Sequence, residues 1–217
     1  MNTVVEDYVK NIYAHTEWQP DAITPSALAS RLGLAASSVT EMVKKLAAAG
    51  LVTHVKYGAV TLTVEGEALA LRMLRRHRLI ETWLVESFGY TWDQVHDEAE
   101  VLEHALSDRL LEKIAEQLGQ PVRDPHGDPI PASDGTVVRP RAVLLSQAPD
   151  GHQGAIVRIS DANPELLIHL QQEGFVLDAA VTVVRRKPFG GALTVSVASL
   201  EHDVGDELAS AVWLSVD

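Results

Sequence analysis

The stretch ITPSALASRLGLAASSVTEMVKKLAAAGLV, residues 23–52, decides the fold of the N-terminal part of this chain. Thr24 or Ser26 can cap a short first helix, which is expected to end at Gly33 in a tight turn. Apolar residues recur at helical spacing over 37–49 and predict a second helix. Two short helices joined by a glycine-containing turn are typical of a helix-turn-helix.

The flanking segments complete this motif. Before it, VVEDYVKNIY has apolar residues at i, i+3, i+4, i+7 and i+8, which predicts an amphipathic helix. After it, THVKYGAVTLT, residues 53–63, reads as two short strands around Gly58, the pattern of a wing. Residues 1–63 are therefore expected to form a winged-helix domain.

The second helix of this motif is the candidate for reading DNA. Its N-terminal part would enter the major groove, where hydroxyls and a carboxylate can meet base edges while lysines suit phosphates. Lysines on such a helix are also compatible with a merely solvated face. The candidate DNA-binding residues are Ser37, Ser38, Thr40, Glu41, Lys44 and Lys45, with Lys56 and Tyr57 at the tip of the wing.

Two further regions follow. Residues 64–140 contain three helical patterns, over 64–89, 93–106 and from Ser107 to about 118, and then a connector rich in Pro, Gly and Asp. Residues 141–217 change to alternating apolar and polar positions, interrupted by one short helical pattern over 164–174. This region is expected to be a small β-barrel or sandwich, so the chain as a whole is assigned to the α+β class.

Composition excludes several function classes. The chain has no cysteine, which removes disulfides, thiolate metal sites and cysteine nucleophiles. No apolar run is long enough to span a bilayer, and the N-terminus has no basic-then-apolar leader, so we expect no membrane partner and a cytoplasmic location. The HExxH motif, a Gly-rich phosphate loop and a nucleophile elbow are all absent, and we do not expect an enzyme.

The net charge of −12 is unevenly distributed. Residues 79–108 contain eight acids and no Lys or Arg, and within them VHDEAEVLEHAL (95–106) is rich in ligand-type residues. On a continuous helix, four of these would share an arc of roughly 100°: they are His96, Glu100, Glu103 and His104. On the preceding helix, His77 and Glu81 are spaced i, i+4 and share a face.

Carboxylates and imidazoles without thiolates suit Mn²⁺, Fe²⁺ or similar ions, so this region is a candidate metal centre. A solvated acidic helix is the alternative interpretation. Under that alternative the chain is a winged-helix regulator that responds to an organic ligand. A helical carboxylate–histidine hydrolase or oxidase would need a substrate pocket that nothing in the sequence marks.

At these residues the chain resembles the metal-dependent transcriptional repressors of the diphtheria toxin repressor family, and within it the actinobacterial manganese-transport regulators. The resemblance rests on SSVTEMVKKLAAAGLV with HVKYGAVTLT, then RRHRLIETWL, VHDEAEVLEHALSD and DPHGDPIP. It implies an N-terminal winged helix-turn-helix, a helical dimerisation domain and an SH3-like C-terminal domain. It also implies a homodimer that binds a palindromic operator when a divalent metal is present, and that represses genes for metal uptake.

The resemblance implies two sets of metal ligands. The regulatory set would be Asp7, Glu100, Glu103 and His104. Iron-sensing relatives have Met and Cys in place of Asp7 and Glu100, so oxygen donors there indicate Mn²⁺, with Fe²⁺ as the alternative. Two-domain manganese regulators carry a further Glu where this chain has Lys10, and a charged lysine is no ligand.

The second, ancillary set would contain His77, Glu81 and His96 together with a residue of the C-terminal domain, for which Asp161 is the best local match. The connector motif DPHGDPIP adds Asp124 and His126 as further candidates. For His126, the role of a turn residue between Pro and Gly is an equally good interpretation.

Overall fold

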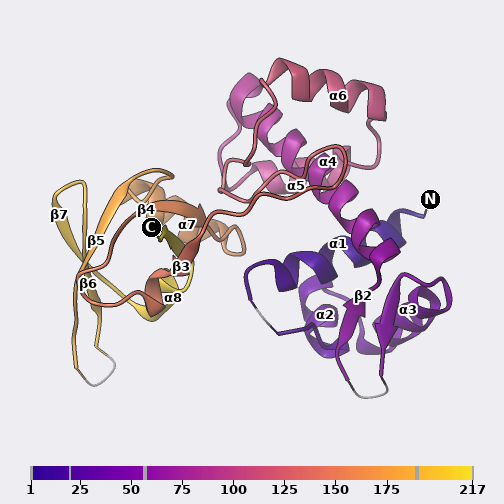
Figure 1. Cartoon of the computed structure of the whole chain (residues 1–217), viewed down its shortest axis with the longest axis horizontal. Helices are drawn as coiled ribbons and strands as arrows, with labels where there is room; N and C mark the ends of the chain where they lie inside the picture. Colours follow the sequence, from indigo (N-terminus) through magenta and orange to yellow (C-terminus); the bar gives the residue numbers. More distant parts are fainter. Residues whose placement is uncertain (1, 20, 56–57, 189–190, 217) are drawn as a thin grey trace. The chain divides into compact units, whose positions relative to one another are not determined.

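A computed structural model describes residues 2–19, 21–55, 58–188 and 191–216. The chain divides into two compact units, each described by itself below. The first unit is Met1–His77 with Pro131–Thr136, and the second is Arg78–Ile130 with Val137–Asp217. Both can be followed by colour along the chain in Figure 1.

The first unit is a winged helix-turn-helix, as predicted. Its elements are α1 (Thr3–Glu17), α2 (Pro25–Leu32), α3 (Ala36–Ala48), β1 (Val52–His54), β2 (Val60–Leu62) and the first part of α4 (Val64–Phe88). The cap of α2 is Thr24, whose side-chain oxygen accepts a hydrogen bond from the backbone N–H of Ala27 at 3.2 Å. Gly33 ends α2 in the left-handed conformation, with φ of 64°, where a side chain would be strained.

The core of the first unit ties α3 to α1. Val39, Val43 and Leu46 of α3 are almost completely buried, in one cluster with Tyr8 and Ile12 of α1. Fully burying such a side chain contributes about 1.5–3 kcal/mol. The position of α3 is thus set by α1, and its polar residues are left on the outer face.

The helical part of the second unit differs from the prediction at one place. α5 spans Val95–Leu102, shorter than the expected 93–106, and α6 (Asp108–Gln117) starts at its cap Ser107. The backbone N–H groups of Ala105 and Leu106 both donate to the carbonyl of Leu102, which closes a turn in front of α6. Glu103 is the C-cap of α5, with helical backbone angles and its N–H bonded to the carbonyl of Ala99, whereas His104 lies beyond the helix. The argument from a shared helical face therefore holds for His96, Glu100 and Glu103 but not for His104.

The C-terminal part of the second unit is a single antiparallel sheet in the order β3-β8-β4-β5-β6-β7. Its elements are β3 (Ala142–Leu144), the 3₁₀ turn η1 (Leu145–Gln147), β4 (Gln153–Ile159), α7 (Pro164–Gln172), β5 (Ala180–Arg186), β6 (Leu193–Val197), β7 (Leu200–Val204), α8 (Asp206–Ala209) and β8 (Val212–Ser215). The sheet packs around one apolar core that includes Phe175, Leu145 and Val183.

The expectation of a closed β-barrel is wrong. Within the described residues, the edge strands β3 and β7 pair with β8 and β6 and not with each other. β4 pairs with β5 along its first half and with β8 along its second, with a register shift between Ile156 and Arg158. Such a shift bends the sheet, but β3 has only three residues and the sheet stays open.

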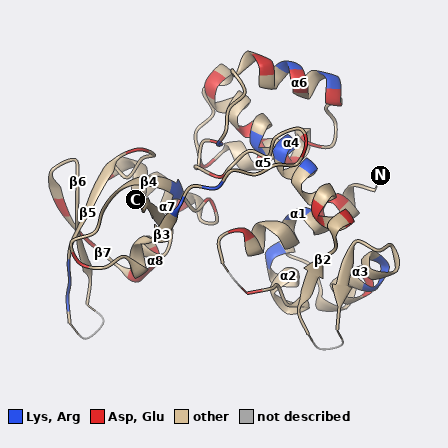
Figure 2. Cartoon of the chain, viewed as in Figure 1, with Lys and Arg blue, Asp and Glu red and all other residues tan. Residues whose placement is uncertain are grey.

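The helices of the described residues include none that is both long and apolar enough to cross a membrane. The longest of them, α4, has 25 residues and carries acidic and basic side chains along its length (Figure 2).

Candidate metal centre and DNA-binding face

The regulatory ligand set is distributed over both units. Asp7 is half-buried on α1 of the first unit. In the second unit Glu100 is half-buried on α5, whereas Glu103 is fully buried in the turn that follows. His104 Nε2 lies 3.4 Å from Glu103 Oε1. The structure thus brings Glu103 and His104 together within one unit, and their association with Asp7 stays a prediction.

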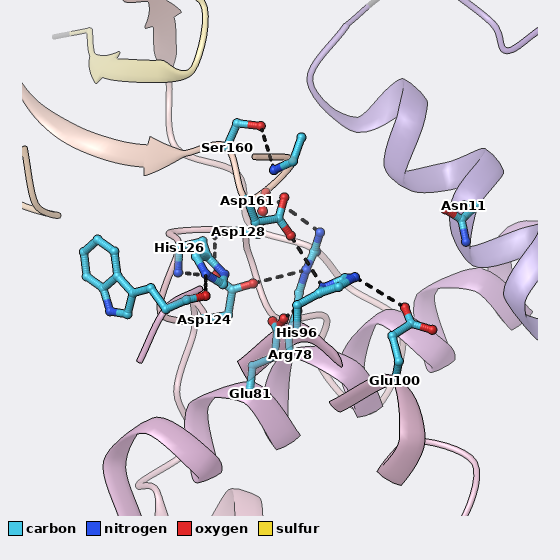
Figure 3. A network of polar contacts seen from close by, with 12 residues as sticks. Asn11, Arg78, Glu81, His96, Glu100, Asp124, His126, Asp128, Ser160 and Asp161 are labelled. Carbon is cyan, nitrogen blue, oxygen red and sulfur yellow. Dashed lines mark hydrogen bonds and ion pairs between the residues drawn. The ribbon is translucent and has the colours of Figure 1, made fainter. Parts of the chain in front are cut away.

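The second unit also gathers residues that are far apart in the sequence (Figure 3). His96 of α5 lies close to three carboxylates. Its Nδ1 lies 3.4 Å from Glu81 Oε1 and 3.8 Å from Asp161 Oδ2. Its Nε2 lies 3.7 Å from Glu100 Oε1. Glu81 comes from α4, His96 from α5, and Asp161 from the loop that follows β4. Asp161 thus lies beside Glu81 and His96, and its role as a metal ligand stays a prediction.

The connector adds two buried candidate ligands to the same place. Ligand atoms of Glu81, Asp124 and His126 lie within 4.8 Å of one another, as do those of Glu81, His96 and Asp161. Donors that share an ion at bond lengths of about 2.0–2.2 Å are at most about 4.4 Å apart. Small side-chain rotations would therefore suffice to bring either group onto one cation.

His126 has the geometry of a metal ligand. Its side chain is completely buried, and its Nε2 lies 3.1 Å from the carbonyl oxygen of Trp92. A carbonyl only accepts, so Nε2 carries the proton and donates it, which leaves Nδ1 of the neutral ring as a lone pair. Within the described residues Nδ1 has no hydrogen-bond partner, although it is buried. Ligating histidines typically donate their other N–H in this way, so the residues present fit a metal ion.

The carboxylates of this cluster favour positive charge at its centre. Burial disfavours the protonated form of His126, but the carboxylates of Asp124, Glu81 and Asp161 outweigh it and raise its pKa. For Asp124, burial and then the negative charges of Asp128 and Glu81 raise the pKa to about 8. Without a metal, protons occupy positions that a divalent ion would take.

Asp124 is itself held in place by its own loop. Its Oδ1 accepts the backbone N–H groups of His126, at 2.8 Å, and Asp128, at 3.0 Å. Its Oδ2 lies 3.6 Å from Arg78 Nε. The loop backbone thus bonds Oδ1 of Asp124, whereas Oδ2 lies near Arg78.

His77 is buried on α4 and belongs to the first unit by the division above. It precedes Glu81 by one helical turn, so the two side chains start from one face of α4. Its association with His96 and Asp161 remains a prediction.

Sequence reasoning missed four residues that shape the cluster. Trp92 provides a backbone carbonyl, for which no sequence signal exists. Arg78 is part of the RRHRLIETWL motif and Asp128 is part of the DPHGDPIP motif, but neither residue was assigned a role from the sequence. Arg158 precedes Asp161 by three positions in RISDANPELL and could have been found from that spacing.

The DNA-binding candidates on α3 all lie on its exposed face: they are Ser37, Ser38, Thr40, Glu41, Lys44 and Lys45. Lys44 Nζ lies 2.7 Å from Glu41 Oε1, and this hydrogen-bonded pair lowers the pKa of Glu41. Both side chains are 65% exposed, so the pair is weak and is easily exchanged for a phosphate contact. Lys56 and Tyr57 lie outside the described residues.

A winged helix with an open polar face on α3, together with a buried carboxylate–histidine cluster that attracts cations, defines a metal-binding DNA-binding protein. Sequence models of known families agree. Residues 1–60 match the N-terminal DNA-binding domain of iron-dependent repressors, residues 63–132 match their metal-binding and dimerisation domain, and residues 143–216 match the FeoA domain.

Individual relatives cover nearly the whole chain. The diphtheria toxin repressor of Corynebacterium efficiens is 35% identical over 95% of this chain and 93% of its own, and the iron-dependent repressor IdeR of Mycobacterium tuberculosis is 30% identical over 98% of both. A solved manganese-dependent transcriptional repressor in complex with manganese is 48% identical over 98% of this chain and 100% of its own, with a TM-score of 0.93. The chain belongs to the diphtheria toxin repressor family of metal-dependent, DNA-binding repressors.

Proposed function

We propose that this protein is a Mn²⁺-activated repressor that binds a palindromic operator as a homodimer and controls genes for divalent-metal uptake. The observation that carries the choice of metal is the donor set. Every candidate ligand is a carboxylate or an imidazole, in a chain without cysteine. Oxygen and nitrogen donors suit Mn²⁺, whereas sulfur donors favour softer ions.

Two ligand sets would hold the metal. The regulatory set is Asp7, Glu100, Glu103 and His104. The second set is drawn from His77, Glu81, His96, Asp124, His126 and Asp161. A bound divalent ion supplies positive charge that neutralises clustered carboxylates and links the elements that carry them.

The residues of the chain suggest how this linkage reaches DNA. Asp7 lies on α1, one residue before Tyr8, which packs in the core shared with α3. A metal that joins Asp7 to Glu103 and His104 would therefore fix α3 relative to the helical domain. In a homodimer it would set two copies of α3 about one DNA turn apart, or a multiple of it. Metal and DNA then strengthen each other's binding equally.

Fe²⁺ is the main alternative, since relatives described as iron-dependent are 30% identical over the whole chain. Fe²⁺ binds a given oxygen and nitrogen site more tightly than Mn²⁺, so only geometry can favour manganese. A regulator that answers to an organic ligand would leave the orphaned Nδ1 of His126 unexplained, and an enzyme would leave the winged helix unexplained.

The decisive test is DNA binding with and without metal. Fluorescence anisotropy on promoter DNA of candidate manganese-uptake genes and of the protein's own gene would be measured in excess Mn²⁺, in excess Fe²⁺ without oxygen, and in chelator. We expect tight binding only with metal, and at lower free concentrations of Mn²⁺ than of Fe²⁺. Equal binding in chelator would contradict metal activation.

The ligand assignment is tested by Glu103→Ala. Because Glu103 is buried beside His104, we expect its loss to weaken metal-dependent DNA binding at least about 100-fold, or about 2.7 kcal/mol, while the dimer persists. Glu98→Ala removes the same charge from α5 at a position outside both ligand sets and is the matched control. An unchanged metal response of the Glu103→Ala variant would refute the regulatory set.

A further inference from the structure

The second ligand set is backed by a buried ion-pair bridge made of residues that are not themselves candidate ligands. Asp128 Oδ1 lies 2.6 Å from Arg158 Nε, which donates a hydrogen bond to it, and 3.9 Å from Arg78 Nη2. All three residues are at most 9% exposed. We refer to Arg78, Asp128 and Arg158 as the carboxylate bridge.

The carboxylate bridge joins the two segments that carry ligands. On the connector, Asp128 follows Asp124 and His126 by four and two residues. On β4, Arg158 precedes Asp161 by three residues. The backbone N–H of Ile159 also donates to the carbonyl of His126 at 2.9 Å, so the two segments are in direct contact next to the bridge.

This contact leaves no free space. Gly127 has a φ of 94°, and a Cβ atom there would lie 2.1 Å from the carbonyl oxygen of Val157. Only glycine allows the connector to approach β4 this closely. The position of Asp128 over Arg158 is thus determined by the backbone of both segments.

Arg78 extends the same fixation to α4, the helix of Glu81. Its Nη1 donates to the carbonyl of Pro129 at 2.7 Å, and its Nε lies 3.6 Å from Asp124 Oδ2. Arg158 is further held by the ring of Trp213, whose centroid is 4.3 Å from its Cζ. Elements that carry Glu81, Asp124 and Asp161 are therefore connected through one buried carboxylate.

We propose that Asp128 is a positioning residue of the second metal set. It holds the end of β4 and the loop that follows it against the connector, so that Asp161, Asp124 and His126 bind one ion together. The proposal rests on the second ligand set of the proposed function. A buried ion pair in itself adds little stability, because desolvation offsets the attraction. What the carboxylate bridge adds is the relative position of two ligand segments.

The test isolates the second set in a full-length Glu103→Ala chain, in which the regulatory set is disabled. Mn²⁺ is titrated calorimetrically into this parent and into Asp128→Asn, Asp128→Glu and Asp178→Asn variants of it. Asp178→Asn is the matched control, since Asp178 also pairs with a connector residue, Arg123, with an Oδ1 to Nη1 distance of 2.9 Å, but at an exposed position. Thermal unfolding of the metal-free variants is measured in parallel.

We expect Asp128→Asn to weaken Mn²⁺ binding at least about tenfold, as loss of a residue that orients ligands commonly does. The Asp128→Glu variant should retain more of the Mn²⁺ affinity than Asp128→Asn, and the Mn²⁺ affinity of the Asp178→Asn variant should stay within about twofold of that of the parent. A structural role alone would lower the unfolding temperature of metal-free Asp128→Asn and leave its Mn²⁺ affinity unchanged, which overturns the proposal. Equal losses in Asp128→Asn and Asp178→Asn also overturn it.

If Asp128→Asn does not fold, the double variant Asp128→Asn with Arg158→Gln removes both charges and is measured in its place, with the same outcomes. If the Glu103→Ala parent binds no Mn²⁺ while the wild-type chain binds it, the second ligand set and this proposal both fail, but the regulatory set stands. If neither chain binds Mn²⁺, the proposed function fails as well.

Discussion

The outer face of α3 and the cluster around His126 are both polar, but they are opposite in physical character. On α3 the charged side chains are exposed, and Glu41 and Lys44 balance each other in water. Around His126 the carboxylates are largely buried, and they raise the pKa of that imidazole. An exposed, solvated face is accessible to a partner without any bound ion, whereas a buried cluster with excess negative charge responds to the concentration of a cation. The two regions therefore suit two different partners, DNA for the exposed face and a metal ion for the buried cluster.

The largest effect is expected when the same type of substitution, Glu to Gln, is made once in each of the two regions. Glu81→Gln in the Glu103→Ala chain removes a buried negative charge from the cluster, so we expect Mn²⁺ affinity to fall at least about 100-fold, or about 2.7 kcal/mol. Glu41→Gln in the same chain removes an exposed charge on α3 and should leave that affinity unchanged. Calorimetric titration measures both. Similar losses would show that only overall charge matters.

A smaller effect is expected from pH. Because the pKa of Asp124 is raised to about 8, Mn²⁺ must displace its proton below that value. Affinity of the Glu103→Ala chain should rise at least about tenfold per unit from pH 6.5 and level off above about pH 8. In the Asp124→Asn variant, Mn²⁺ affinity should depend less on pH. If the Mn²⁺ affinity of the Glu103→Ala chain with Asp124 intact did not change with pH, Asp124 would not belong to the metal-binding cluster.

The same raised pKa sets the sign of the stability change. The metal-free folded state holds this proton more tightly than the unfolded state does. The stability that the proton contributes is present at low pH and is lost as the pH rises from about 4 towards 8. The raised pKa of His126 acts in the same direction. In chemical denaturation, the metal-free Asp124→Asn variant should therefore lose less stability over this pH range than the metal-free chain with Asp124.

The smallest effect is expected on the exposed face. Lys44→Ala should weaken operator binding about fivefold at 0.15 M salt and lower the salt slope by about one, since one phosphate contact is lost. Folding stability should stay nearly unchanged, because the pair with Glu41 is exposed. Lys113→Ala on α6, where an exposed pair with Glu116 has the same i, i+3 spacing, is the control. Anisotropy titrations at several salt concentrations compare the operator affinity of the two variants. If both variants lost affinity equally, α3 would not be the helix that binds the operator.

Local patterns predicted most of the elements, but not their ends or their closure. The winged helix followed from helical periodicity and from Gly33. The end of α5 at Leu102 did not, because apolar spacing continues to Leu106 while the hydrogen bonds turn towards the cap of α6. The strands β3 and β7 and the helix α8 were also missed. β3 and α8 are short, and much of β7 is exposed.

The sequence by itself determined the element types, the open polar face of α3 and the chemistry of the donors, because these depend on residue type and spacing along one segment. Tertiary structure alone decided which donors meet. Glu81, His96, Asp124, His126 and Asp161 come from four separate segments, and their meeting depends on the packing of the connector against α4 and β4. It also decided that Asp128 binds Arg158 and that the carbonyl of Trp92 orients His126. Backbone atoms and long-range pairs leave no local signature in a sequence.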